Sequence, residues 1–216
     1  MFSSLTLLLF AVAFGFSQSA TDYYNRGVEK EKANDLDEAW TNFTKAVELK
    51  PDYAAAYYAL GNIEYYKGDF DGASTNYTKA IDLKSDYAVA YCNRGSAKGE
   101  KGDFDGALAD CNRAIELNPN LAKAYDGRGN AKDNKGDLDG ALADYTKAIE
   151  LKPDYAVAYY NRGVTKHKRG DLGGELADYN EAISLWQEAI QQNPSQKLQI
   201  QARMKKAEQS KSQIKK

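Results

Sequence analysis

Residues 122–155 read AKAYDGRGNAKDNKGDLDGALADYTKAIELKPDY, and the 34 residues before them read AVAYCNRGSAKGEKGDFDGALADCNRAIELNPNL. The two stretches agree at 21 of 34 places without a gap. The same spacing separates five glycines and five tyrosines: Gly27, Gly61, Gly95, Gly129 and Gly163, and Tyr23, Tyr57, Tyr91, Tyr125 and Tyr159. Self-similarity at a fixed period indicates stacked repeats. We therefore divide the chain into five units: 20–53, 54–87, 88–121, 122–155 and 156–189.

Each unit has the pattern of two helices joined by a tight turn. In the second unit Tyr57, Leu60 and Gly61 lie at helical spacing, and Lys67-Gly68-Asp69 then interrupts the pattern. A second helix is expected to begin at Asp69 or Asp71. Its buried side chains recur on one face: Ala73, Tyr77, Ala80, Ile81 and Leu83. The unit is therefore a helical hairpin.

The composition excludes several classes of protein. The chain has 216 residues, a formal net charge of -2 and a pI of about 5.6, which argues against a protein that coats nucleic acid. Two cysteines and one histidine cannot supply the three or four closely spaced ligands of a zinc site. We expect no cofactor, no metal and no nucleic-acid partner.

The first residues have the pattern of a secretory signal peptide. Leu5 to Phe16 is an uncharged, largely apolar run of 12 residues, and the small residues of Ser17-Gln18-Ser19-Ala20 follow it. A helix needs about 20 apolar residues to cross a bilayer, so the run is too short for a permanent anchor. We expect residues 1–19 to be removed and the protein to be exported to the periplasm or the extracellular space. In a eukaryote this would be the secretory pathway, and no integral membrane segment would remain.

The units resemble the tetratricopeptide repeat, whose pattern runs aromatic-x-x-Leu-Gly, then Ala-x-x-x-aromatic, then Pro. The fourth unit carries it as Tyr125, Gly129, Ala141, Tyr145 and Pro153. The resemblance covers residues 20–189. It implies an all-α fold, a right-handed superhelical solenoid of antiparallel helix pairs, whose concave groove holds segments of partner proteins.

Some positions depart from the family pattern. Arginine takes the usual leucine place in four units: Arg26, Arg94, Arg128 and Arg162. Cys111 stands where an aromatic residue is usual. Glu175 replaces the small residue at the helix crossing of the fifth unit, which argues against tight packing of that hairpin.

The end of the array differs from the other units. Ala182-Ile183 is followed seven residues later by Ala189-Ile190, so we expect the second helix of the fifth unit to be long. Residues 190–216 then form a C-terminal capping helix and a basic tail. Their weak apolar stripe consists of Leu198, Ile200, Met204 and Ala207. From Gln196 onward there are seven basic residues and one acidic residue.

No group of residues predicts catalysis, and we expect no enzyme. The Asp-x-Asp-Gly sequences at Asp69, Asp103 and Asp137 lack the further ligands of a calcium loop, so these aspartates are interpreted as helix caps. His167 has no nucleophile or carboxylate placed beside it by a motif, so it is interpreted as a surface histidine.

Two modifications stay open at the level of the sequence. Cys92 and Cys111 lie on the two helices of one hairpin, and export would permit a disulfide, although two independent thiols are favoured. Asn42 and Asn76 head glycosylation acceptor sequences, which matter only in a eukaryote.

Five tyrosines do not belong to the recurring packing positions. They are Tyr24, Tyr58, Tyr65, Tyr66 and Tyr160. On a helical wheel they point away from the buried seam of the first helix, and the resemblance implies that this face lines the groove. Asparagines share the face, one from each unit: Asn25, Asn62, Asn93, Asn130 and Asn161. Amide side chains both donate and accept, which suits a peptide backbone. These ten residues are the candidate peptide-binding groove.

The predicted function is a protein-interaction module that binds an extended segment of a partner whose identity the sequence does not encode. A glycan-binding groove is the alternative, with Tyr58, Tyr65, Tyr66 and Tyr160 stacked on sugar rings. An enzyme, and a contact between the basic tail and an acidic lipid or nucleic acid, are further alternatives.

Overall fold

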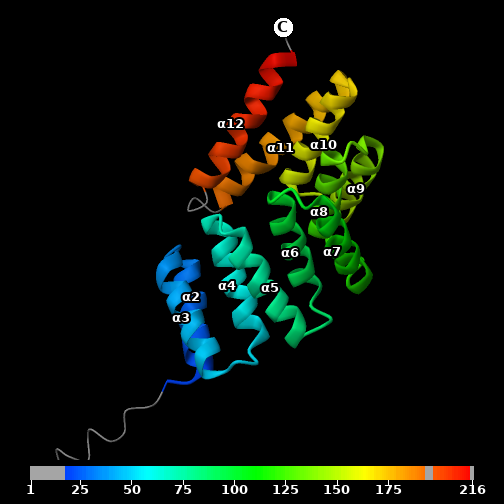
Figure 1. The fold of residues 1–216 in the computed structure, drawn as a ribbon. Coiled ribbons are helices and arrows are strands. Elements are labelled where there is room, and N and C mark those ends of the chain that lie inside the picture. Colours follow the sequence, from blue (N-terminus) through cyan, green and yellow to red (C-terminus); the bar gives the residue numbers. More distant parts are fainter. Residues whose placement is uncertain (1–17, 193–196, 215–216) are drawn as a thin grey trace, which may run out of the picture.

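The computed structural model describes residues 18–192 and 197–214, and all regular secondary structure in these ranges is helical (Figure 1). Five antiparallel pairs follow one another, and each pair packs on the next. The helices are α2 (Ala20–Lys32), α3 (Leu36–Leu49), α4 (Ala54–Lys67), α5 (Phe70–Leu83), α6 (Ala88–Glu100), α7 (Phe104–Leu117), α8 (Ala122–Asn134), α9 (Leu138–Leu151), α10 (Ala156–Arg169), α11 (Leu172–Gln192) and α12 (Lys197–Ile214). The fold is thus the expected all-α solenoid.

The turn inside the second to fifth pairs is set by a glycine and an aspartate, and in the first pair Asn34 takes the place of the glycine with a φ of 60°. Gly68 adopts a left-handed φ of 82°, which ends α4, and the carboxylate of Asp69 accepts a hydrogen bond from the backbone N–H of Gly72 at 2.9 Å. The capping contact satisfies one of the free N–H groups at the start of α5. The same cap recurs at Asp103, Asp137 and Asp171. The interpretation of these aspartates as caps is confirmed.

Close packing within a pair depends on the recurring glycine. A Cβ atom on Gly61 would lie 2.7 Å from the ring of Tyr77, and one on Gly129 would lie 2.8 Å from the ring of Tyr145. In the third unit Cys111 replaces the ring, and a Cβ on Gly95 would lie 3.1 Å from its sulfur. The aromatic residue of the second helix therefore requires the glycine of the first.

Three of the four arginines at the usual leucine place have a buried partner, whereas Arg26 donates to the exposed side chain of Gln18 at 3.2 Å. Arg94 donates two hydrogen bonds to Asp110, at 2.8 and 2.7 Å, and Lys98 lies 2.8 Å from the same carboxylate. Arg94 also donates to Thr78 on the preceding pair at 3.0 Å. Equivalent ion pairs join Arg128 and Lys132 to Asp144, and Arg162 and Lys166 to Asp178. The departure from the family pattern thus replaces an apolar contact by an ionic one that also links neighbouring units.

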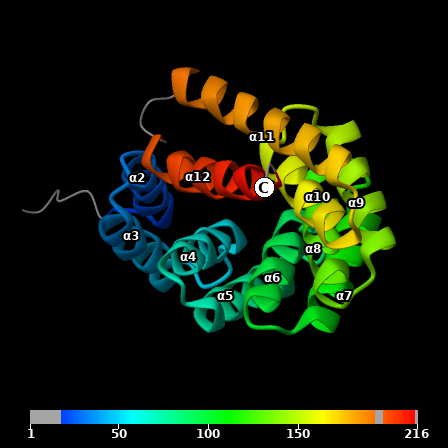
Figure 2. The same ribbon diagram turned by 90° about the horizontal axis from the view of Figure 1, so that it is seen from above.

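The repeats curve, and their helices form two rows. α4, α6, α8 and α10 lie on the inner side of the curve, whereas α5, α7 and α9 lie on the outer side (Figure 2). The inner row is therefore the concave face.

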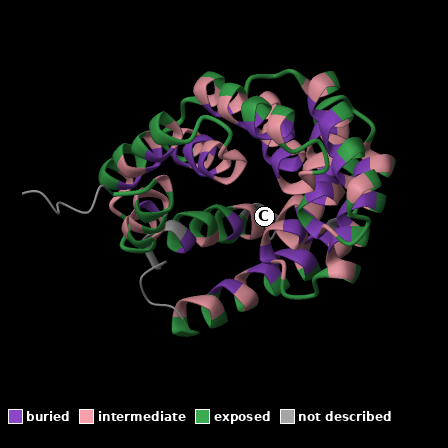
Figure 3. Cartoon of the chain, turned by 90° about the horizontal axis from the view of Figure 1, so that it is seen from below, coloured by how far each residue is buried: buried purple, intermediate pink, exposed green. Residues whose placement is uncertain are grey.

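The last two helices pack against each other at the end of the curve. α11 has 21 residues against 14 in the other second helices, so the expectation of a long helix is confirmed. Tyr179 and Trp186 of α11 form one apolar cluster with Ile200 and Ala207 of α12. Seen from above and from below, α12 lies inside the curve of the repeats (Figures 2 and 3). Most of its described side chains are exposed.

Glu175 does not prevent the fifth pair from forming. Its side chain is fully buried between α10 and α11, and one carboxylate oxygen lies 2.8 Å from Nδ1 of His167. The other oxygen has no hydrogen-bond partner within the described chain. A buried carboxylate therefore stands at the crossing, in place of the usual small residue.

Some predictions fall outside the described residues. The apolar run of the predicted signal peptide lies within residues 1–17, and the side chain of Leu198 and the end of the basic tail are likewise outside. Across the ranges that the structure describes, no helix has both the length and the apolar character needed to span a membrane.

Candidate functional site

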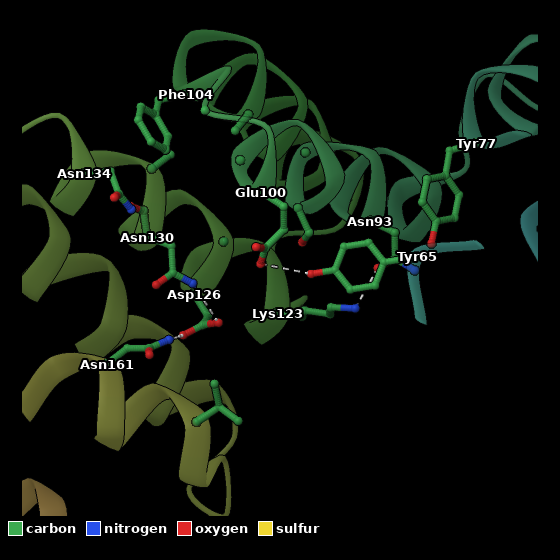
Figure 4. A pocket seen from close by; sticks show the side chains of 18 of the residues that line it. Tyr65, Tyr77, Asn93, Glu100, Phe104, Lys123, Asp126, Asn130, Asn134 and Asn161 are labelled. Atoms are coloured by element: carbon green, nitrogen blue, oxygen red, sulfur yellow. Dashed lines mark hydrogen bonds between the residues drawn. The ribbon is translucent and has the colours of Figure 1, made fainter. Parts of the chain in front are cut away.

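A cleft of about 790 Å³ lies on the concave face. Its walls come mainly from α4, α6, α8 and α10, with Tyr77 of α5 and Phe104 of α7, and Arg203 of α12 borders it as well. Figure 4 shows polar side chains from α4, α6, α8 and α10 pointing toward one another across this space. The cleft thus spans four consecutive units and one side chain from the last helix.

The third unit lacks the aromatic rings that recur in the second unit. In the second unit the ring of Tyr58 lies 5.9 Å from that of Tyr77 and 5.1 Å from that of Tyr87. The same places in the third unit, 34 residues on, hold Cys92, Cys111 and Leu121, and Gly99 stands where the second unit has Tyr65. Of these four residues Gly99 lines the cleft, so the absence of a ring at this place leaves space on the inner face.

In the fourth unit the same place holds a carboxylate. Asp126 stands where the first, second and fifth units have Tyr24, Tyr58 and Tyr160, while its two neighbours are Tyr145 and Tyr155. The side chain is 6% exposed and lines the cleft. A buried carboxylate thus replaces a ring that elsewhere packs on two others.

Asp126 is held by neutral donors. Asn161 donates to its Oδ1 at 2.9 Å, and Asn130 and the Tyr155 hydroxyl approach its Oδ2 at 3.4 and 3.5 Å. Burial raises the pKa of Asp126 to about 6, against the hydrogen bond from Asn161 and the charges of Lys123 and Arg203, which act to lower it. The carboxylate is therefore costly to ionise in this position.

The asparagines connect neighbouring units. Asn93 donates to the side-chain oxygen of Asn62 at 2.9 Å and to the hydroxyl of Tyr58 at 3.0 Å, and it accepts from Lys123 at 2.7 Å. Tyr77 donates to the same oxygen of Asn62 at 2.9 Å. The amides thus already make hydrogen bonds within the protein, and a ligand would meet a connected network instead of separate free amides.

Six of the ten predicted groove residues line the cleft: Asn62, Tyr65, Tyr66, Asn93, Asn130 and Asn161. Tyr66 is 68% exposed, whereas Tyr65 is half-buried, packs on Phe70 and donates a long hydrogen bond of 3.4 Å to Glu100.

The other four predicted residues lie elsewhere. Tyr24 packs on Phe43 and Tyr53, Tyr58 packs on Tyr77 and Tyr87, and Tyr160 packs on Tyr179 and Trp186. Asn25 is exposed on α2 and does not line the cleft. A wheel of one helix does not include the rings of the second helix and of the turn after it, which cover these three tyrosines. Of the four tyrosines assigned to sugar stacking, only Tyr65 and Tyr66 border the cleft.

Sequence reasoning missed the central carboxylate. Asp126 appears in no local motif, and only the comparison of position 126 with 24, 58, 92 and 160 distinguishes it. Tyr155 is not among the five tyrosines singled out above, yet its hydroxyl reaches Asp126. Arg203 could not be placed from the repeats, because it lies on a helix that follows them.

The remaining candidate groups form no reactive site. Cys92 and Cys111 are buried free thiols, and burial raises the pKa of Cys92 to about 12. The amide of Asn76 donates to Glu64 at 2.7 Å, so a glycan on that nitrogen would disrupt this contact. Within residues 18–192 and 197–214, no three His, Cys, Asp or Glu side chains gather where they could hold a metal ion.

Family models match the chain across the repeats. One described as TPR repeat matches residues 32–65, 61–102 and 134–170, and one described as tetratricopeptide repeat matches residues 88–121. No curated protein matches the sequence.

Solved structures share the fold. MamA is 26% identical over 76% of this chain and 96% of its own, with a TM-score of 0.63. YrrB, described as a TPR protein with an unusual peptide-binding site, is 26% identical over 93% of this chain and 98% of its own, with a TM-score of 0.60. TTC0263 of Thermus thermophilus is 22% identical over 88% of this chain and 98% of its own, with a TM-score of 0.70. This likeness supports the fold alone.

Proposed function

Because the chain belongs to the tetratricopeptide repeat family, we propose that it is a protein-interaction module that binds an extended segment of a partner protein in the concave cleft. The observation that carries this proposal is the cleft itself, a concave space of about 790 Å³ walled by four consecutive units. A concave site with a few convergent polar groups is the usual form of a binding site.

The chemistry of the cleft suits a peptide. Amide groups from the repeat units supply donors and acceptors at successive places along the inner row, and Tyr65 and Tyr66 add aromatic surface at one end. A peptide carries the same two kinds of group, backbone amides and side chains, along its length. The described peptide-binding site of YrrB is consistent with this use of the fold.

The experiment is a selection of peptides from a random library on the immobilised full chain, followed by affinity measurements with variants. Tyr66→Ala removes an exposed ring at the cleft and should weaken binding about tenfold. Leu49→Ala removes an exposed apolar side chain of α3 that does not line the cleft, and binding should not change. Equal losses in both variants would contradict a groove site. Displacement of the peptides by free oligosaccharide would instead favour the glycan alternative.

We propose further that the protein is exported, on the strength of the apolar run at Leu5 to Phe16. The site of cleavage matters for α2, because the hydroxyl of Ser19 accepts from the N–H of Asp22 and its N–H donates to the Asp22 carboxylate. Cleavage before Ser19 would keep this cap, whereas a start at Ala20 would remove it. Sequencing of the mature N-terminus decides between them, and an intact Met1 would contradict export.

A further inference from the structure

Asp126 differs from the other buried acidic side chains. Five carboxylates are buried among the described residues: Asp110, Asp126, Asp144, Glu175 and Asp178. Three of them each pair with an arginine and a lysine, and Glu175 pairs with His167. No basic side chain within the described ranges lies within 4 Å of Asp126. Buried carboxylates are normally paired with a cation, so Asp126 lacks a partner of the usual kind.

The carboxylate of Asp126 also has unused capacity to accept hydrogen bonds. Its Oδ1 makes one good contact, with Asn161, but the two contacts of Oδ2 are 3.4 and 3.5 Å long. A hydrogen bond to a carboxylate is normally about 2.7–2.9 Å long when the donor is charged. A closer donor from the cleft would therefore gain a strong interaction at Oδ2.

The nearest cations of the protein are engaged or positioned elsewhere. Lys123 projects from the turn of α8 that precedes Asp126, but its ammonium group is held by the amide oxygen of Asn93 at 2.7 Å (Figure 4). Arg203 reaches the edge of the same cleft from α12 without forming an ion pair with Asp126. The cleft thus contains a carboxylate that forms no ion pair with a cation of the described chain.

We propose that the partner segment carries an arginine or lysine whose cationic group enters the cleft and donates hydrogen bonds to the carboxylate of Asp126. The inference rests on the proposed function, and it names the side chain that the cleft selects. A guanidinium group has five donors, so it can contact Asp126 and at the same time the amide oxygens beside it. The positive charge that compensates the buried carboxylate of Asp126 then comes from the partner, and not from the protein itself.

The first test compares peptide selection on three full-length proteins: wild type, Asp126→Asn and Glu100→Gln. Glu100 is the matched control, because it is an acidic residue that borders the same cleft but is exposed. Peptides enriched by the wild type and by Glu100→Gln should share a basic residue at one position, and those enriched by Asp126→Asn should not. Circular dichroism of each variant verifies that the helices are retained.

The outcomes separate the two proposals. Enrichment of no peptide by the wild type would contradict the proposed function and the inference together. Enriched peptides without a shared basic residue, or an unchanged preference in Asp126→Asn, would contradict only the inference. A preference lost in Glu100→Gln and kept in Asp126→Asn would likewise overturn it, because the selectivity would then belong to Glu100.

The second test leaves the protein unchanged. A selected peptide is compared with the same peptide in which the shared arginine is replaced by citrulline, a neutral side chain of the same shape; for a shared lysine, acetyl-lysine is used. Wild-type protein should bind the neutral peptide on the order of ten- to a hundredfold more weakly, the range expected for a charged hydrogen bond. Asp126→Asn should bind both peptides about equally. Equal binding of both peptides by the wild type would overturn the inference.

Discussion

The replacement Asp126→Asn should stabilise the protein at neutral pH, although it removes a carboxylate that accepts hydrogen bonds. Asparagine has nearly the same shape as aspartate and can still accept from Asn161. It carries no charge, so it avoids the cost of holding an ionised carboxylate that is 6% exposed. The expected gain follows from the pKa of Asp126 in the folded protein.

The magnitude can be worked from that pKa. Burial raises it from 3.8 to about 6, and a difference of about 2 corresponds to about 3 kcal/mol of folding free energy. Between these two values the folded state binds more protons than the unfolded state, so this contribution to stability is lost as the pH rises from about 4 to about 6. The amide donor introduced at position 126 faces the donor of Asn130, which costs about 1 kcal/mol. We therefore expect a net gain of about 2 kcal/mol at pH 7.

The assay is urea unfolding of wild type and Asp126→Asn, followed by circular dichroism at pH 4, 5, 6 and 7. Titration of the paired carboxylates affects both proteins, so the difference in unfolding free energy isolates Asp126. The unfolding free energy of the variant minus that of the wild type should rise by about 3 kcal/mol between pH 4 and pH 7. At pH 7 the variant should be more stable by about 2 kcal/mol. A difference that does not vary with pH, or a variant less stable at pH 7, would refute the reasoning.

Two further predictions concern the packing of the repeats. Gly129→Ala should destabilise the protein by about 1–3 kcal/mol in urea unfolding, because the new Cβ would lie 2.8 Å from the Tyr145 ring, whereas Gly95→Ala should cost less; equal costs would contradict the paired roles of glycine and ring. Asp144→Asn should cost about 3–5 kcal/mol, since it leaves a partly buried arginine and lysine without their carboxylate, and the exposed Asp105→Asn should cost less than about 1 kcal/mol. Similar losses in the two aspartate variants would show that the buried ion pairs are no stronger than those at the surface.

Much of the fold follows from the spacing of a few residue types. Glycine and aspartate at the turn predict where each helix ends and the next begins, because their backbone and capping properties are local. The extra seven residues between Ala182 and Ala189 likewise predict the length of α11. These features depend on neighbours along the chain, so a single sequence is sufficient to read them.

The site was predicted only in part, because its chemistry depends on contacts between units. The wheel placed Tyr58 and Tyr160 on the open face, but rings from the second helix cover them. Asp126 looks like any polar residue within its own helix, and its best hydrogen bond comes from Asn161 of the next unit. Aligning the five units and comparing the residues at each equivalent position, in addition to reading each helix by itself, would have identified both features.

The most direct test of groove binding is photo-crosslinking of a selected peptide to the full chain. Benzoylphenylalanine replaces either Tyr66, which is exposed at the cleft, or Thr75, which is exposed on α5 in the outer row. Crosslinks from position 66, and none from position 75, are the result expected if the concave cleft holds the peptide. Crosslinks from position 75 alone, or equally from both, would contradict binding in the cleft.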